Sequence, residues 1–173
     1  MKCGGNYAAS LMASNRARTL GFDQTLWLDP LHRRSIEELS GMNFFAAIDG
    51  KLYTPAMNGS ILPGITRDSL IQIARGMGHE VVECELLIED VIRAIEEGRC
   101  SEAFACGTAA IVAPISVIGE ADGREYPLPN DPGPIAVALK QELLDIQEGR
   151  VEDRFGWVTT LDPKWYPVPA KVA

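Results

Sequence analysis

The stretch NFFAAIDGKLYTP, residues 43–55, decides the fold of this chain. Its first part is dominated by aromatic and aliphatic side chains of the kind enriched in strands, so residues 43–48 are predicted to form a strand. Asp49-Gly50 follows, a dipeptide that strongly indicates a two-residue β-hairpin turn. We therefore expect residues 51–55 to be the returning strand of the hairpin.

Similar patterns extend the prediction to both sides of the hairpin. Apolar residues at helical spacing, with a glycine closing each run, predict helices over residues 7–20, 66–77, 88–97 and 135–149. Strand-like composition predicts further strands over residues 25–29, 80–86, 102–108 and 109–120. Helices and strands are intermixed without a strict βαβ alternation, which favours the α+β class.

Length and composition indicate one globular domain. The chain has 173 residues, with 16 Lys and Arg against 24 Asp and Glu, so its formal net charge is −8. A chain of this length buries a core without disulfides, and 46% hydrophobic with 23% charged residues is a globular composition. We expect the domain over residues 1–157 and an irregular tail, rich in proline and aromatic residues, over residues 158–173.

The charge and several missing patterns exclude classes of function. An acidic chain is a poor general ligand for nucleic acid, which requires a basic face. The sequence has neither a run of about 18 apolar residues nor the apolar segment of a signal peptide, so we expect a cytoplasmic protein that spans no membrane. Its four cysteines form no CxxC pair and no cluster with histidine, which predicts reduced thiols and no metal site.

Three segments carry residues suited to a ligand. Leu62-Pro-Gly-Ile-Thr66 leads into a predicted helix, whose unpaired amide groups and positive dipole end favour a phosphate. Gly107-Thr-Ala-Ala110 places small residues and a hydroxyl between two strands, where they can contact a phosphate or a carboxylate. Glu38 is a carboxylate beside a small apolar segment that leads into a strand, where a site can hold it.

Each of these residues also has a simpler interpretation. Thr66 fits the N-cap of an ordinary helix, and Thr108 fits a tight hairpin turn. Glu38 fits a solvated surface carboxylate, and Lys2 fits a mobile charge near the end of the chain. Taken one at a time, the residues leave both interpretations open.

Five motifs, however, follow one another in a fixed order. They are Lys2-x-Gly-Gly-Asn-Tyr7, Leu26-Trp-Leu-Asp29, Glu38-x-Ser-Gly-Met-Asn43, Leu62-Pro-Gly-Ile-Thr-Arg-Asp68 and Gly107-Thr-Ala-Ala110. In this order and spacing they resemble the fold-type IV enzymes that depend on pyridoxal phosphate (PLP), and most closely the branched-chain amino acid aminotransferases. With a closing Asp153-x-x-Gly-Trp157, the resemblance extends over nearly the whole chain.

The resemblance implies the large PLP-binding domain of this fold and a role for each matching residue. Lys2 falls on the lysine that links covalently to the cofactor and then moves the substrate's proton. Tyr7 falls on the tyrosine that binds the cofactor's phenolic oxygen. Glu38 falls on the partner of the pyridine nitrogen, and Leu62 on the residue that packs against the ring.

The same resemblance implies the remaining contacts and the reaction. Contacts to the cofactor's phosphate fall on Ile65, Thr66 and Thr108, and contacts to the substrate's carboxylate fall on Thr108 and Ala109. The implied reaction is transamination between an amino acid and a 2-oxo acid, with leucine, isoleucine or valine as donor and 2-oxoglutarate as acceptor. The implied assembly is a homodimer.

The chain departs from the family pattern in two places. Mammalian relatives carry a redox CxxC after the Gly-Thr-Ala turn, but here those positions are Ala110 and Ala113, so we expect no thiol switch. The family's smaller N-terminal domain, which contributes to the phosphate site and the substrate pocket, has no counterpart in the sequence. We therefore expect a cofactor-binding half that is weakly active alone and works with a separate small domain or within a longer chain.

Two alternatives remain at this stage. The chain fits a different fold-type IV enzyme less well, such as a D-amino acid aminotransferase or an aminodeoxychorismate lyase. It also fits a non-catalytic chain that binds PLP or a partner without turnover.

Overall fold

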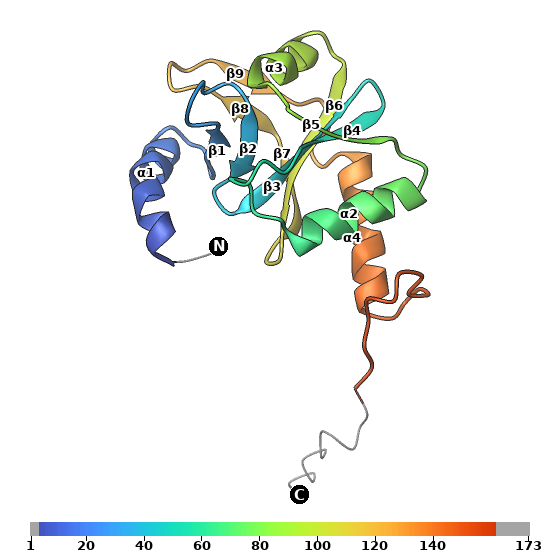
Figure 1. Ribbon diagram of the computed structural model, residues 1–173. Helices are drawn as coiled ribbons and strands as arrows, with labels where there is room; N and C mark the ends of the chain where they lie inside the picture. The colour runs from blue at the N-terminus through green and yellow to red at the C-terminus, as the bar shows by residue number, and fades with distance from the viewer. Residues whose placement is uncertain (1–3, 162–173) are drawn as a thin grey trace, which may run out of the picture.

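The computed structural model describes residues 4–161 of the chain. Its helices are η1 (Gly4–Ser10, a 3-10 helix), α1 (Leu11–Thr19), α2 (Ile65–Gly76), α3 (Ile88–Glu96) and α4 (Pro134–Gln147). Its strands are β1 (Leu26–Leu28), β2 (Ile36–Leu39), β3 (Met42–Ile48), β4 (Lys51–Pro55), β5 (Val81–Cys84), β6 (Cys100–Gly107), β7 (Ile111–Ile115), β8 (Val117–Gly119) and β9 (Glu125–Pro127). Figure 1 shows a central sheet between α2 and α4 on one side and α3 with the β8–β9 hairpin on the other.

β3 and β4 form the predicted hairpin. The strands pair antiparallel, with Ile48 opposite Lys51. Asp49 and Gly50 have φ values of 50° and 77°, and a type I′ turn requires positive values at both central positions. The hairpin predicted from residues 43–55 is therefore confirmed.

β3 is the centre of a seven-stranded sheet. β6 runs antiparallel along one edge of β3, from Asn43 to Ile48. β2 and β4 share the other edge, because β2 pairs with the start of β3 and β4 with its end. At the split between these two partners, the buried hydroxyl of Thr54 donates to the carbonyl of Phe44 at 2.8 Å. This bond satisfies a backbone group inside the core.

The pairing pattern confirms the α+β class. β4 and β5 run parallel and are connected through α2. The other pairings among the described strands are antiparallel. A mixed sheet of this kind differs from the regular βαβ repetition of a parallel fold.

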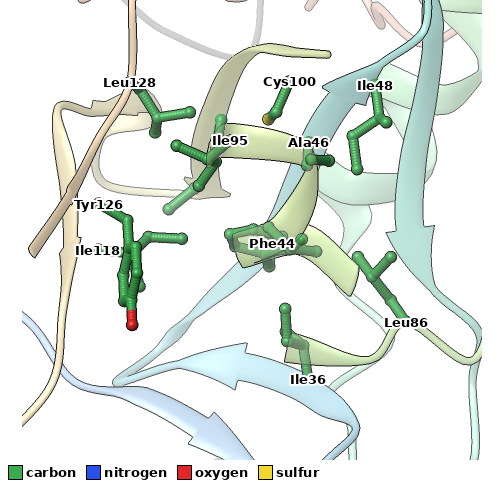
Figure 2. Close-up of a cluster of buried hydrophobic side chains, with 14 of the residues drawn as sticks. Ile36, Phe44, Ala46, Ile48, Leu86, Ile95, Cys100, Ile118, Tyr126 and Leu128 are labelled. Carbon is green, nitrogen blue, oxygen red and sulfur yellow. The ribbon is translucent and has the colours of Figure 1, made fainter. Parts of the chain in front are cut away.

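Side chains of β3 alternate between two apolar cores. Phe44 and Ala46 face α3 and the β8–β9 hairpin, and Figure 2 shows Phe44 in the middle of this cluster. Phe45 and Ala47 face α2 and α4. A strand that is buried on both faces carries a continuous apolar run, which explains the sequence of residues 44–48.

The expectation of one strand over residues 109–120 is wrong. β7 ends at Ile115 and β8 begins at Val117, where the chain leaves the main sheet. β8 instead pairs with β9 in a separate two-stranded sheet, and the Leu128 N–H donates to the Ser116 carbonyl at 2.8 Å beside it. The break follows from tertiary structure, since this hairpin covers the core around Phe44.

Neither end of the described chain forms part of the two cores. The helix expected over residues 7–20 is a 3-10 helix followed by α1 from Leu11, and α1 buries none of its residues. Residues 158–161 have no regular secondary structure, whereas residues 162–173 of the expected tail lie outside the described residues, so the boundary at residue 157 stays a prediction. Within residues 4–161, no helix is long and apolar enough to cross a membrane.

Replacing Phe104 by alanine is expected to lower the free energy of unfolding by about 3–5 kcal/mol. The Phe104 ring is fully buried and stacks on Phe45 with a centroid distance of 5.1 Å, so its loss leaves a cavity between the sheet and α2. Urea denaturation followed by circular dichroism measures the change. Leu31→Ala is the control, since Leu31 is 80% exposed and its removal should change stability by less than about 0.5 kcal/mol. Equal effects of the two substitutions would contradict this core assignment.

Candidate functional site

A hollow of about 30 Å³ lies where the start of β3, the end of β6 and the start of α2 meet. Three segments that are distant in the sequence line it, namely residues 38–43, 62–66 and 106–108. Among the lining residues are Glu38, Leu62, Ile65, Thr66 and Thr108. The structure therefore brings together five of the residues that the sequence predicted for one site.

The sheet supplies one wall of this hollow. Asn43 of β3 lies opposite Glu38 of β2 and opposite Cys106 of β6. Residues that lie opposite each other in paired strands share a face of the sheet. Phe45, two residues further along β3, packs toward α2, so this row faces the start of that helix.

Two neighbouring glutamates hold the loop between β4 and α2 against β2. Glu38 is half-buried, and its Oε2 accepts a hydrogen bond from the Leu62 N–H at 3.2 Å. Glu37 Oε1 accepts hydrogen bonds from Ser60 Oγ at 2.5 Å and from Asn58 Nδ2 at 3.2 Å. The interpretation of Glu38 as a solvated surface carboxylate is therefore wrong.

The start of α2 forms the end of the hollow that suits an anion. The N-cap of α2 is Gly64, and no side chain caps the helix. The interpretation of Thr66 as the N-cap is therefore wrong. Thr66 instead lies within the first turn, and it lines the hollow. Amide groups of a first turn have no partner within the helix, and the helix dipole adds positive charge there. A phosphate group is the typical ligand of this arrangement.

The other predicted residues are placed differently. Thr108 lies in the turn between β6 and β7, as its simpler interpretation predicts, and it also lines the hollow. Ala109 follows in the same turn and Tyr7 lies on η1, but neither belongs to the lining among residues 4–161. Lys2 lies outside the described residues.

Sequence reasoning did not single out Arg67, a buried residue in the first turn of α2. Arg67 is 5% exposed, and its Nη2 donates to the Pro55 carbonyl at 2.8 Å and to Glu83 Oε2 at 3.0 Å. It thereby ties the start of α2 to the ends of β4 and β5. The sequence did contain a signal for this pairing, namely an arginine at the predicted start of a helix. The helix dipole disfavours a cation there, so the arginine needs an acidic partner.

Glu83 is that partner, and its ionisation responds to the pairing. Burial raises the pKa of Glu83, but hydrogen bonds from Arg67 and Arg75 together lower it more, so the pKa lies below its ordinary value. Arg75 donates to the second oxygen of Glu83 at 3.1 Å. The carboxylate therefore stays ionised at neutral pH and balances two cations on α2.

Two of the described cysteines are buried and offer no nucleophile at neutral pH. Cys84, Cys100 and Cys106 are free thiols. Burial raises the pKa of Cys100 to about 11 and that of Cys106 to about 12. Both thiols are therefore protonated and unreactive at neutral pH. In the part of the chain that the structure describes, no three His, Cys, Asp or Glu residues gather as a metal site.

A larger cavity, of about 880 Å³, lies between α1 and the strands β7 and β8. Its described lining contains none of the residues that the sequence predicted for the site. We therefore assign the candidate site to the smaller hollow, because its lining residues match the predicted ones although its volume is smaller.

The family model for amino-transferase class IV matches residues 3–118. This chain belongs to that family. The matched range includes all three segments that line the hollow. Membership therefore rests on the part of the chain that carries the candidate site.

Relatives with assigned names are similar over most of the chain. The probable branched-chain-amino-acid aminotransferase of Staphylococcus epidermidis is 45% identical over 156 residues, which are 90% of this chain and 44% of that protein. The branched-chain-amino-acid aminotransferase of Mycolicibacterium smegmatis is 42% identical over 165 residues, which are 93% of this chain and 45% of that protein. The chain thus spans less than half the length of these curated relatives.

Solved structures confirm the fold-type IV architecture. The branched-chain amino acid aminotransferase from Escherichia coli has a TM-score of 0.75 at 34% identity, over 92% of this chain and 50% of that one. The PLP form of the branched-chain amino acid aminotransferase from Thermobaculum terrenum has a TM-score of 0.74 at 34% identity, over 87% of this chain and 45% of that one. This class IV chain shares the fold of those enzymes over about half of their length.

Replacing Glu83 by glutamine is expected to lower the free energy of unfolding at pH 7 by about 1–3 kcal/mol, because Arg67 loses a charged partner. The folded-state pKa of Glu83 is lowered, so its contribution is fully present above its ordinary value of 4.5 and is lost as the pH falls through the folded-state value. Wild type and variant should therefore converge in stability below pH 4.5.

Urea denaturation at a series of pH values measures this convergence. Glu80→Gln is the matched control, since Glu80 pairs with Lys51 on the surface, where an ion pair contributes less than about 1 kcal/mol. A stability difference for Glu83→Gln that is independent of pH would show that the ion pair is not its cause.

Proposed function

We propose that this chain is the cofactor-binding part of a PLP-dependent aminotransferase that uses leucine, isoleucine and valine, with 2-oxoglutarate as amino acceptor. One observation carries the proposal: on a class IV chain, the residues predicted for the ring and the phosphate line a single hollow. The names of the relatives support the choice of amino acids, since the relative at 42% identity is named a branched-chain-amino-acid aminotransferase and the one at 45% identity a probable one.

The donor set of the hollow fits PLP. The first turn of α2 offers backbone amide groups and the Thr66 hydroxyl to a phosphate, and Thr108 adds a second hydroxyl from the β6–β7 turn. Glu38 offers a carboxylate, which is the group that pairs with a protonated ring nitrogen. Leu62 adds an apolar residue to the lining.

When bound, PLP supplies an electrophilic aldehyde and an electron-withdrawing ring. In the proposed reaction, Ile65, Thr66 and Thr108 bind the phosphate, and Leu62 packs against the ring. Glu38 holds the proton on the ring nitrogen, which keeps the ring electron-withdrawing.

The proposal gives Lys2, Tyr7 and Ala109 the roles that their motifs imply. Lys2 would hold the cofactor through its Nζ, with loss of water. Once the substrate's amino group has displaced that nitrogen, the freed amine would take the proton from the substrate's Cα. Tyr7 binds the phenolic oxygen, and the backbone at Thr108 and Ala109 binds the substrate's carboxylate. We also propose a cytoplasmic homodimer in which a smaller domain, on a separate or longer chain, completes the substrate pocket.

Titration of the purified chain with PLP, followed by borohydride reduction and peptide mapping, tests the proposal. We expect a shift of the cofactor's absorption band and a reduced adduct on Lys2. Lys2→Arg should abolish the adduct, whereas the matched variant Lys51→Arg, at an exposed lysine paired with Glu80, should leave it unchanged. Absence of any adduct on Lys2 would overturn the proposal.

Substrate tests on the loaded chain separate the alternatives. Conversion of leucine supports the proposed reaction, and conversion of D-alanine or aminodeoxychorismate supports another enzyme of this fold. An adduct on Lys2 without conversion of any substrate, both by the chain alone and in the presence of the smaller domain that completes the pocket, supports a chain that binds PLP without turnover.

Replacing Thr66 by valine is expected to weaken PLP binding by about 10- to 100-fold, because a hydrogen bond to a charged phosphate is lost while the shape is kept. The dissociation constant from the absorption titration measures the change. Thr159→Val is the control at an exposed position outside the hollow and should leave the constant unchanged. Unchanged affinity for Thr66→Val would remove Thr66 from the phosphate site.

A further inference from the structure

We infer that Asn43 is a positioning residue of this site: its side chain holds the Leu62 peptide in place, and Gly64 lacks a side chain because Asn43 fills that space. The inference deepens the function proposed above, since Leu62 and the start of α2 are its proposed cofactor contacts. In this role Asn43 acts on the cofactor site only through Leu62 and Gly64.

Side chains from two paired strands hold both polar groups of Leu62. Its N–H donates to Glu38 Oε2 at 3.2 Å, and its carbonyl accepts from Asn43 Nδ2 at 3.0 Å. Glu38 and Asn43 lie directly opposite each other in β2 and β3. The orientation of the Leu62 backbone is therefore set by the register of these strands.

The burial of Asn43 makes this contact specific. Asn43 is 5% exposed, although it is a polar residue within a strand of aromatic and aliphatic side chains. A buried amide needs a hydrogen-bond partner, because water cannot replace one that is lost. The partner supplied here is the carbonyl of the loop.

Gly64 gives a second, independent observation. Its φ of −71° and ψ of 130° are accessible to any residue, so the backbone conformation does not require glycine. A Cβ at this position would lie only 2.2 Å from Asn43 Oδ1. A side chain at residue 64 would therefore require the Asn43 amide to move.

Asn43 therefore contacts the loop on both sides of Pro63. On one side it bonds to Leu62, and on the other it packs against Gly64, the N-cap of α2. Leu62 is the proposed ring contact, and the turn after Gly64 is the proposed phosphate contact. One amide side chain thereby fixes the spacing between the two ends of the cofactor site.

A double-mutant cycle on the full chain tests the inference, with Asn43→Ala, Gly64→Ala and the double variant. One readout is the hydrogen exchange of the Leu62 amide without cofactor, since its N–H donates to Glu38, and the other is the PLP dissociation constant. Each single substitution should speed exchange and weaken binding by about tenfold. The double variant should be no worse than Asn43→Ala alone, because the methyl group added by Gly64→Ala then has room.

The matched control is Asn130→Ala, which removes a hydrogen bond of the same type and length, from Asn130 Nδ2 to the Ser101 carbonyl at 3.0 Å, far from the loop. It should leave both readouts unchanged. If Asn43→Ala does not fold, Asn43→Asp replaces it as a single variant. It has the same shape but cannot donate to the Leu62 carbonyl, so it should also speed exchange of the Leu62 amide.

Two results would overturn the inference: unchanged exchange of the Leu62 amide after substitution of Asn43, or effects of Asn43→Ala and Gly64→Ala that simply add. Failure of the wild-type chain to bind PLP would instead overturn the proposed function. The exchange measurements need no cofactor, so they decide the role of Asn43 in either case.

Discussion

Burial of β3 on both faces is the constraint on which this structure depends. Its side chains fill two cores in alternation, and its two edges are occupied by β6 on one side and by β2 and β4 on the other. A slip of one residue would turn Asn43 away from the hollow and into the opposite core. The packing of the two cores therefore determines the position of the candidate site.

Local patterns predicted the parts of the fold that local physics decides. The Asp49-Gly50 hairpin and the helices after the loops follow from turn chemistry and apolar spacing, and both were found. β2 was not predicted, because Ile36–Leu39 contains two glutamates and becomes a strand only through its pairing with β3. The end of β7 was misplaced because the β8–β9 hairpin forms to cover a core that only the assembled fold creates.

The candidate site divides in the same way. Thr66 and Glu38 could be named because a glycine, a hydroxyl and a carboxylate stand in recognisable motifs near the ends of elements. The sequence did not indicate that Asn43 holds the loop or that Arg67 holds the start of α2, because their hydrogen-bond partners Leu62 and Glu83 are distant in the sequence. The proposed phosphate site needs no basic side chain on this chain of net charge −8, since its donors would be backbone amides and hydroxyls of α2 and the β6–β7 turn.

β2 and β4 share one edge of β3, and residues 56–61 form a bridge from the end of β4 to Leu62, whose backbone is bound to β2 and β3. Residues 57–60 of this bridge are exposed, and Glu37 tethers it through Asn58 and Ser60. Doubling the length of such a loop costs only about 0.6 kcal/mol in closure entropy. Insertions here would lengthen the connection while the anchors of Leu62 on β2 and β3 stay in place, so the bridge can vary in length without moving the residues that line the hollow.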